Sequence, residues 1–306
     1  MAEQPPGISA VAGLVASLPI RARRRALRSL FHLTALTRGG ARAGLSPCFE
    51  RVLRLPRREA VRLDREAAFH DALAEMEWLS LHRRSLTGIR SDLDHVSVRS
   101  PEILTHLASR GEPVILAPLH MGPYVLGLLK ILLTFFPDRS LLVLRRRDDR
   151  PLETRVMQRI TEFGIPVRFL TVTDRSGYLP AVRFARQSAV LVVFGDLPPS
   201  YGRPAAMPVL GLPTAFAFGI ETLAHLTGAT VVPLAVAARA GGSIVMPSDP
   251  FTVRANDPEE RDRVAELMRR HIEATVRTWP EQWHHWARLP EFLPAAGEPV
   301  PRGGAA

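Results

Sequence analysis

The 306-residue chain contains little cysteine and little lysine, and both scarcities are informative. Its one cysteine, Cys48, excludes an internal disulfide and a cysteine-based metal site, so we expect a reducing, cytoplasmic location. Lys130 is the only lysine, and arginine therefore carries nearly all of the formal net charge of +10. Such a basic surface favours anionic partners: phospholipid headgroups, an acidic carrier protein or nucleic acid. No recognised nucleic-acid-binding module accompanies the charge, so we expect no nucleic-acid partner.

The sequence also lacks an N-terminal apolar run that is long enough to cross a bilayer, which takes about 20 residues. Ile8–Ile20 is apolar over only 13 residues and runs into Arg21, Arg23, Arg24 and Arg25. A cleaved signal peptide fits poorly, because these charges follow the apolar segment. Two interpretations remain open. The segment is a helix on an anionic membrane surface, with its arginines reaching headgroups, or an ordinary amphipathic helix packed on the domain.

Several motifs of common enzyme classes are missing. There is no Gly-x-Ser-x-Gly elbow, no P-loop and no dinucleotide-binding glycine fingerprint, which argues against hydrolase, NTPase and dehydrogenase functions. His284 and His285 lie between two tryptophans, but no third metal ligand is evident nearby in the sequence. We therefore predict no metal site and no cofactor.

What the chain does contain is a regular alternation of strand and helix patterns. Short apolar runs predict strands at 113–118, 140–145, 166–171, 189–194 and 230–237. Helical patterns are found at 101–111, from about 121, and at 151–163, 177–187, 213–227 and 257–278. This alternation predicts an α/β fold whose mostly parallel central sheet is flanked by helices on both faces. Gly241-Gly242 predicts a hairpin that adds an antiparallel strand.

The same sequence patterns divide the chain into three regions. Residues 1–99 are expected to form an N-terminal helical, membrane-proximal extension packed on the core, with one or two helices in 57–86. Residues 100–290 are expected to form the α/β domain, whose first helix begins with Ser100 as a good N-cap. Residues 291–306 are rich in Pro, Gly and Ala and are expected to form a flexible tail.

The most informative segment is Val114–Val125, in which an apolar run of strand length leads to His120 and Gly122. In open α/β sheets the carboxyl ends of the strands face the ligand crevice. A titratable histidine at this place is therefore a candidate for chemistry near neutral pH. The alternative, a helix-capping or core histidine, is about equally compatible with this segment alone.

This segment resembles the histidine motif of the bacterial lipid A late acyltransferases, the lauroyl and myristoyl transferases within the wider glycerolipid acyltransferase group. Their motif is a strand, a histidine, four residues and then Glu or Asp. His120 and Gly122 match it, whereas Val125 occupies the acidic position, which marks a diverged member. Four later regions resemble the same family in the same order: Leu142–Arg146, Val190–Asp196, Leu210–Pro233 and the signature Trp279–Trp286.

The resemblance implies an acyltransferase that acts at the inner face of the cell membrane. It would move a fatty acyl group from an acyl-carrier-protein or coenzyme A thioester to a lipid, glycolipid or amine-bearing acceptor. His120 would be the general base. In the related enzymes the carboxylate orients the imidazole, and Val125 cannot do so.

Three solutions to the missing carboxylate are open. Asp196 ends a parallel strand, so it is expected at the same sheet edge as His120 and can replace the carboxylate. An amine acceptor would need less help from a base than a hydroxyl. Alternatively, the protein binds acyl groups or lipids without catalysis.

Six more residues are predicted to contact substrate: Gly122, Tyr124, Arg145, Arg146, Gly211 and Pro213. Arg145 or Arg146 is predicted to hold a phosphate of the donor or acceptor, because a guanidinium matches phosphate in a bidentate way. Gly211 and Pro213 precede a predicted helix, whose first N–H groups can hold an oxyanion or phosphate. A tight turn at the start of a helix explains these two residues equally well.

Overall fold

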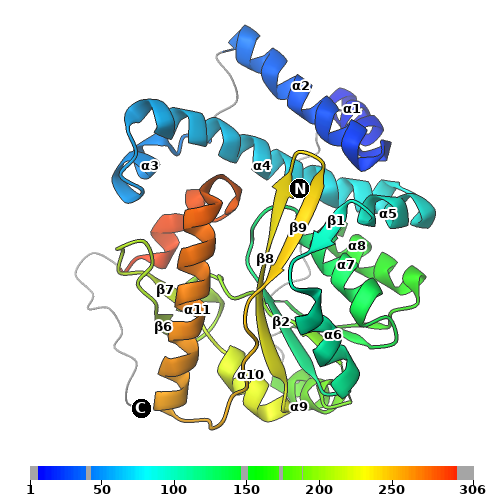
Figure 1. Cartoon of the computed structure of the whole chain (residues 1–306), viewed down its shortest axis with the longest axis vertical. Coiled ribbons are helices and arrows are strands. Elements are labelled where there is room, and N and C mark those ends of the chain that lie inside the picture. Colours follow the sequence, from blue (N-terminus) through cyan, green and yellow to red (C-terminus); the bar gives the residue numbers. More distant parts are fainter. Residues whose placement is uncertain (1–5, 39–42, 146–150, 172–174, 188, 295–306) are drawn as a thin grey trace.

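The computed structural model describes residues 6–38, 43–145, 151–171, 175–187 and 189–294. A seven-stranded sheet with the order β1-β9-β8-β2-β5-β3-β4 crosses the molecule (Figure 1). Every neighbouring pair is parallel except β8 and β9, which form the predicted hairpin. The strands of this sheet are β1 (Val96–Val98), β2 (Val114–Pro118), β3 (Leu141–Arg145), β4 (Val167–Thr171), β5 (Val190–Val192), β8 (Thr230–Arg239) and β9 (Gly242–Pro247). The predicted mostly parallel α/β sheet is therefore confirmed.

Helices cover both faces of this sheet (Figure 1). They are α1 (Pro6–Ser17), α2 (Ile20–Arg38), α3 (Ser46–Val52), α4 (Arg57–Arg83), α5 (Leu86–Leu93), α6 (Pro101–Arg110), α7 (Tyr124–Phe135), α8 (Pro151–Arg159), α9 (Arg175–Ala185), α10 (Ile220–Thr227) and α11 (Pro258–Thr278). Short 3-10 helices are η1 (Ile160–Phe163), η2 (Pro199–Tyr201), η3 (Pro280–Gln282) and η4 (Trp286–Phe292). None of the described helices combines the length and apolar character that a membrane-spanning segment needs.

The central strand β2 shows why its sequence is apolar at every position. Ile115 and Ala117 belong to a core that also contains residues of α10 and α11. Val114 and Leu116 belong to a second core, with residues of α5, α6 and α7. A strand that is covered on both faces has no solvent side, so polar residues do not alternate with apolar ones. β2 thus holds the residues that follow it rigidly at the carboxyl edge of the sheet.

Three details of the predicted elements are wrong. The helix expected over 213–227 begins only at Ile220, because residues 215–217 form β7, which pairs with β6 (Pro204–Ala206). Ser100 has a left-handed backbone (φ 49°), and its side chain makes no capping hydrogen bond. The helix expected to end near residue 163 ends at Arg159 and continues as 3-10 turns.

Buried ion pairs join the N-terminal helices to the rest of the fold. The Arg23 guanidinium lies 2.5 Å from the Glu77 carboxylate and 3.1 Å from that of Asp92. Arg24 lies 3.0 Å from Glu77, and both arginines are buried. The interpretation in which Arg23 and Arg24 reach lipid headgroups is therefore wrong, because their charge is neutralised inside the protein. Arg21 and Arg25 are exposed.

Candidate active site

The turn between β2 and α7 places His120 at the carboxyl edge of the sheet. The turn depends on Gly122, which has φ +52° in the left-handed region. A Cβ atom at this position would lie 2.4 Å from the carbonyl oxygen of Val236 in β8, so no other residue fits without distortion. The Gly122 N–H donates to the Gln282 carbonyl at 2.9 Å. Gly122 therefore shapes the site, and its N–H is already occupied.

Two hydrogen bonds join His120 to Asp196. The His120 backbone N–H donates to Asp196 Oδ2 at 2.8 Å, and the ring Nδ1 lies 2.8 Å from Oδ1. A carboxylate only accepts, so Nδ1 carries the proton of this bond. In the neutral form of such an imidazole Nε2 carries the lone pair. The His120 side chain is 21% exposed, whereas Asp196 is fully buried. This arrangement is the orienting half of a general-base pair.

The environment of Asp196 keeps the carboxylate charged. Burial alone would raise the pKa of Asp196, but electrostatic interaction with the nearby His120 and His285 rings and the hydrogen bonds from His120 and Trp283 outweigh it. The pKa therefore lies well below its usual range. Trp283 contributes its indole Nε1–H, which donates to Oδ2 at 3.0 Å. With three N–H donors on its two oxygens, the carboxylate is held in one orientation.

A second histidine lies behind this pair. The His285 ring centroid is 4.5 Å from that of His120, and His285 Nε2 is 4.0 Å from Asp196 Oδ2. Burial, with a smaller contribution from the neighbouring His120, lowers the pKa of His285 to about 3, so His285 is neutral at physiological pH. Its Nε2 is buried and has no hydrogen-bond partner among the described residues.

Together His120, Asp196 and His285 contain three potential metal ligands, whose ligand atoms lie within 4.8 Å of one another. Asp196 Oδ2 already accepts two N–H bonds and Oδ1 accepts a third, so a metal ion would compete with the donors that hold this carboxylate. The chemistry of this set fits a hydrogen-bonded pair better than a preformed metal centre. The absence of a metal stays a prediction.

The C-terminal signature forms one wall of the site. Its segment pairs with the His120 turn in antiparallel fashion: His284 N–H donates to the His120 carbonyl at 2.9 Å, and Met121 forms a bridge with Trp283. His284 Nε2 also lies 3.0 Å from the Gly122 carbonyl. No local pattern in the sequence indicates this pairing, and only the resemblance to the family drew attention to the segment.

Aromatic rings form the other wall. The Phe194 ring stacks on His120 with centroids 4.0 Å apart and an interplanar angle of 25°. Tyr124 lies edge-on to both rings, at 5.5 Å from His120 and 5.3 Å from Phe194. Tyr124 was predicted to contact substrate, and it lies beside the candidate base. Phe194 was missed, although its place two residues before Asp196 at the same strand end was a signal.

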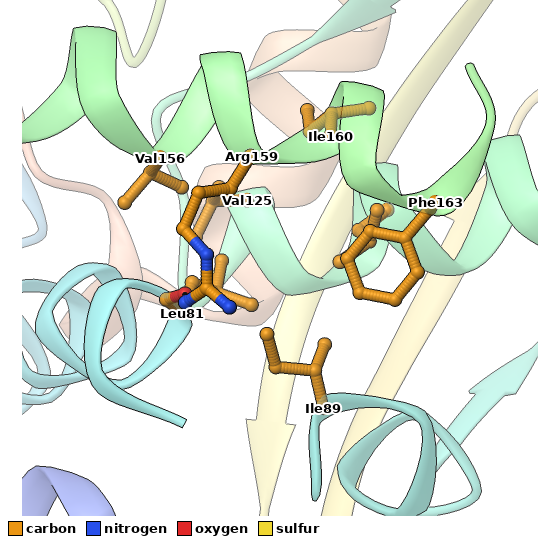
Figure 2. Close-up of a pocket in the computed structure, with 8 residues that line it drawn as sticks. Leu81, Ile89, Val125, Val156, Arg159, Ile160 and Phe163 are labelled. Atoms are coloured by element: carbon orange, nitrogen blue, oxygen red, sulfur yellow. Dashed lines mark hydrogen bonds between the residues drawn. The ribbon is translucent and has the colours of Figure 1, made fainter. Parts of the chain in front are cut away.

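Val125, in the acidic position of the family motif, faces away from this site. Its side chain is 3% exposed and lines a small apolar pocket (Figure 2). Besides Val125, the pocket is lined by Leu81, Ile89, Leu129, Val156, Arg159, Ile160 and Phe163. The Arg159 guanidinium donates to the carbonyls of Leu81, His82 and Arg84. A carboxylate at position 125 would therefore enter apolar packing and not approach Asp196.

The remaining predicted residues are placed as follows. Arg145 ends β3, but its side chain and all of Arg146 lie outside the described residues. Gly211 and Pro213 are exposed, in a turn where Gly211 has φ +77°. The helix expected directly after them starts seven residues beyond Pro213, at Ile220, so no helix N-terminus supports an anion site there. Substrate binding by these four residues stays a prediction.

Sequence comparison adds an independent finding. Residues 8–289 match the model of the bacterial lipid A biosynthesis acyltransferase family. The match includes the His120 turn, Asp196 and the C-terminal segment up to η4. No curated protein matches the chain significantly. The chain therefore belongs to the bacterial lipid A biosynthesis acyltransferase family, a membership that supports acyl transfer to a lipid acceptor.

Proposed function

We propose that the protein transfers a fatty acyl group from a thioester, with His120 as general base and Asp196 as its orienting carboxylate. The observation that carries the proposal is the pair of hydrogen bonds between His120 and Asp196, with both N···O distances at 2.8 Å. It supplies by contact through space what Val125 cannot supply from the next helical turn. The carboxylate is charged and the His120 side chain is partly exposed, as a base requires.

The proposed reaction proceeds through a tetrahedral intermediate. His120 Nε2 takes the proton of the acceptor O–H or N–H while the acceptor atom attacks the thioester carbonyl carbon. The C–S bond then breaks, and His120 returns the proton to the leaving thiolate. The products are an ester or amide and a free thiol. Asp196 stabilises the imidazolium between these two steps.

The donor is proposed to be an acyl-carrier-protein or coenzyme A thioester, which acts as co-substrate, so no further cofactor is needed. Arg145, the last residue of β3, and Arg146, which follows it in the sequence, are proposed to bind its phosphate groups. The acceptor is proposed to be a lipid, glycolipid or amine. An amine would rely least on the base, because a neutral amine is the better nucleophile.

We further propose peripheral binding to an anionic membrane through α1 and α2. Four large apolar side chains of these helices are exposed: Val11, Leu14, Leu30 and Leu33. Exposed Arg21 and Arg25 lie on the same helix pair and suit anionic headgroups. Co-sedimentation with phosphatidylglycerol vesicles is expected to exceed that with phosphatidylcholine vesicles, and Leu14→Glu is expected to weaken it. Leu179→Glu, on α9 far from α1 and α2 (Figure 1), is the matched control and should leave it unchanged.

A second candidate function is an acyl- or lipid-binding protein that does not catalyse transfer. The observation that favours it is Val125 in the acidic position of the motif. This candidate predicts that acyl ligands bind and that no thiol is released in any acceptor's presence.

The test is release of free thiol from acyl-carrier-protein and acyl-CoA thioesters, with total bacterial lipid and simple amines as acceptors. Release by the wild type that falls to background in His120→Ala supports the transferase. Equal release by both proteins would overturn the role of His120. Acyl binding without release in either protein would favour the second candidate.

A further inference from the structure

The C-terminal segment reaches the buried carboxylate through one side chain, Trp283. Its indole N–H donates to Asp196 Oδ2 at 3.0 Å, and the Trp283 residue is 3% exposed. The same oxygen accepts the His120 backbone N–H at 2.8 Å. The two donors together occupy Oδ2, so Oδ1 is the oxygen that faces the His120 ring.

The segment that carries Trp283 is itself anchored. The Gln282 side chain makes two hydrogen bonds to Ala238 in β8, accepting from its N–H at 2.7 Å and donating to its carbonyl at 3.1 Å. The Gln282 carbonyl accepts from the Gly122 N–H, as described above. The position of the indole is therefore set by the central sheet and by the catalytic turn, and not by a mobile chain end.

We infer that Trp283 is a positioning residue for the proposed base pair, and that it acts on His120 through Asp196. The inference rests on the proposed function, because it assigns a role within the same His120–Asp196 pair. The indole N–H orients Asp196 through its oxygen Oδ2 and stabilises the negative charge of this buried carboxylate. Without this donor, Asp196 is held by the two His120 N–H groups alone. Its negative charge is then less stabilised, so the pair holds its proton more tightly.

The chain offers a matched control. Trp286 lies in the same signature, is also buried, and donates its indole N–H to the Pro280 carbonyl at 2.6 Å. Trp283→Phe and Trp286→Phe therefore each remove one buried indole donor from the same region. Only the former removes a donor to Asp196.

Thiol release by the two variants is measured across pH. Trp283→Phe is expected to lower kcat about 10- to 100-fold, the range for a hydrogen bond to a charged group. It is also expected to move the acid limb of the kcat/KM profile upward by about half a pH unit, because loss of a positive N–H dipole favours the protonated pair. Trp286→Phe is expected to keep the wild-type profile. Equal changes in both variants would overturn the inference in favour of a structural role.

A double-mutant cycle tests the route of the effect. If Trp283 acts through Asp196, adding Trp283→Phe to Asp196→Asn causes no further loss of kcat. Independent, multiplying losses would contradict the inference. Circular dichroism and thermal unfolding show whether each variant is folded, and Trp283→Tyr replaces Trp283→Phe if the latter does not fold.

A readout without substrate separates this inference from the proposed function. The proton between His120 Nδ1 and Asp196 gives a low-field proton NMR signal, which is identified by its loss in His120→Ala. Trp283→Phe is expected to shift or broaden this signal, and Trp286→Phe is expected to leave it in place. If thiol release proves independent of His120, the proposed function fails while this measurement still decides whether Trp283 positions Asp196. An unchanged signal in Trp283→Phe would sink the inference alone.

Discussion

Asp196 and Glu77 are both buried carboxylates, and the difference between their surroundings separates the proposed reactive site from a structural ion pair. Glu77 is bound by the guanidinium groups of Arg23 and Arg24, which are themselves buried. Asp196 is bound by N–H groups of His120 and Trp283, and the His120 side chain extends to the surface with 21% exposure. Both clusters bury charge and pair it, as many structural ion pairs do. What distinguishes Asp196 is a titratable group that connects it to the solvent.

The largest effect is expected from Asp196→Asn. The amide keeps the size of the side chain but removes the charge and the acceptor that faces His120 Nδ1. The equivalent change in serine-protease triads lowers kcat about 10⁴-fold, and we expect about 10³- to 10⁴-fold in thiol release. Asp71→Asn is the control, because Asp71 also bonds a histidine, His284, but is about half exposed. A fall of less than tenfold in Asp196→Asn would place Asp196 outside the catalytic pair.

Glu77→Gln should give the opposite result. The protein is expected to be less stable, but its thiol release per folded molecule is expected to be unchanged. The change leaves Arg23 and Arg24 buried without their shared carboxylate, which is expected to lower the free energy of unfolding by about 3–5 kcal/mol. The control is Glu66→Gln, since the Glu66–Arg28 pair is over a third exposed and is worth at most about 1 kcal/mol. Urea unfolding measures both variants. A fall in thiol release per folded molecule of Glu77→Gln would break the comparison.

Val125→Glu tests whether the acidic position of the family motif can serve this fold. Val125 is buried in apolar packing, and Arg159 beside it already bonds three carbonyls. We expect the glutamate to lower the free energy of unfolding by about 2–4 kcal/mol and not to restore thiol release in Asp196→Asn. Val125→Ile, which stays apolar and adds one methylene beside the pocket, should cost about 1 kcal/mol, the low end for an added methylene. Rescue of Asp196→Asn by Val125→Glu would show that the turn can rearrange to bring position 125 to His120.

Much of this fold followed from the sequence, because its signals are local. The apolar run of β2 predicted a strand that is buried on both faces, and the strand before Asp196 predicted its approach to His120. The direction in which the Val125 side chain points was not predictable, because a shift of one residue in the start of α7 changes the face of the helix on which Val125 lies. The contact of Trp283 with Asp196 spans 87 positions and depends on how the chain end folds back. No periodicity encodes such a contact.

The burial of Arg23 and Arg24 is a second feature that the sequence could not predict. In sequence they are part of an arginine cluster after an apolar segment, which is the pattern of a membrane-surface helix. In the structure Glu77 and Asp92, more than 50 positions away, neutralise them. Charge patterns therefore predict that a helix has a polar face but not which charges find a buried partner.

The smallest expected effect concerns how the free energy of unfolding depends on pH, through the buried histidine beside Asp196. Burial lowers the pKa of His285 to about 3, from an ordinary value of about 6.5. Between these values the unfolded chain binds a proton that the folded chain does not, so stability is present above pH 6.5 and is lost as pH falls towards 3. His285→Phe, among aromatic neighbours, removes this contribution. Between pH 6.5 and 4.5, a window above the titration of Asp196, the slope of unfolding free energy against pH should fall by up to about 1.4 kcal/mol per unit.

Urea unfolding at a series of pH values measures this slope. His70 and His271 are also buried with lowered pKa values, of about 3 and about 4, so His285→Phe should reduce the slope and not abolish it. The exposed His106 on α6 provides the control, because His106→Gln should leave the slope unchanged. A slope in His285→Phe equal to that of the wild type would mean that His285 is protonated in the folded protein.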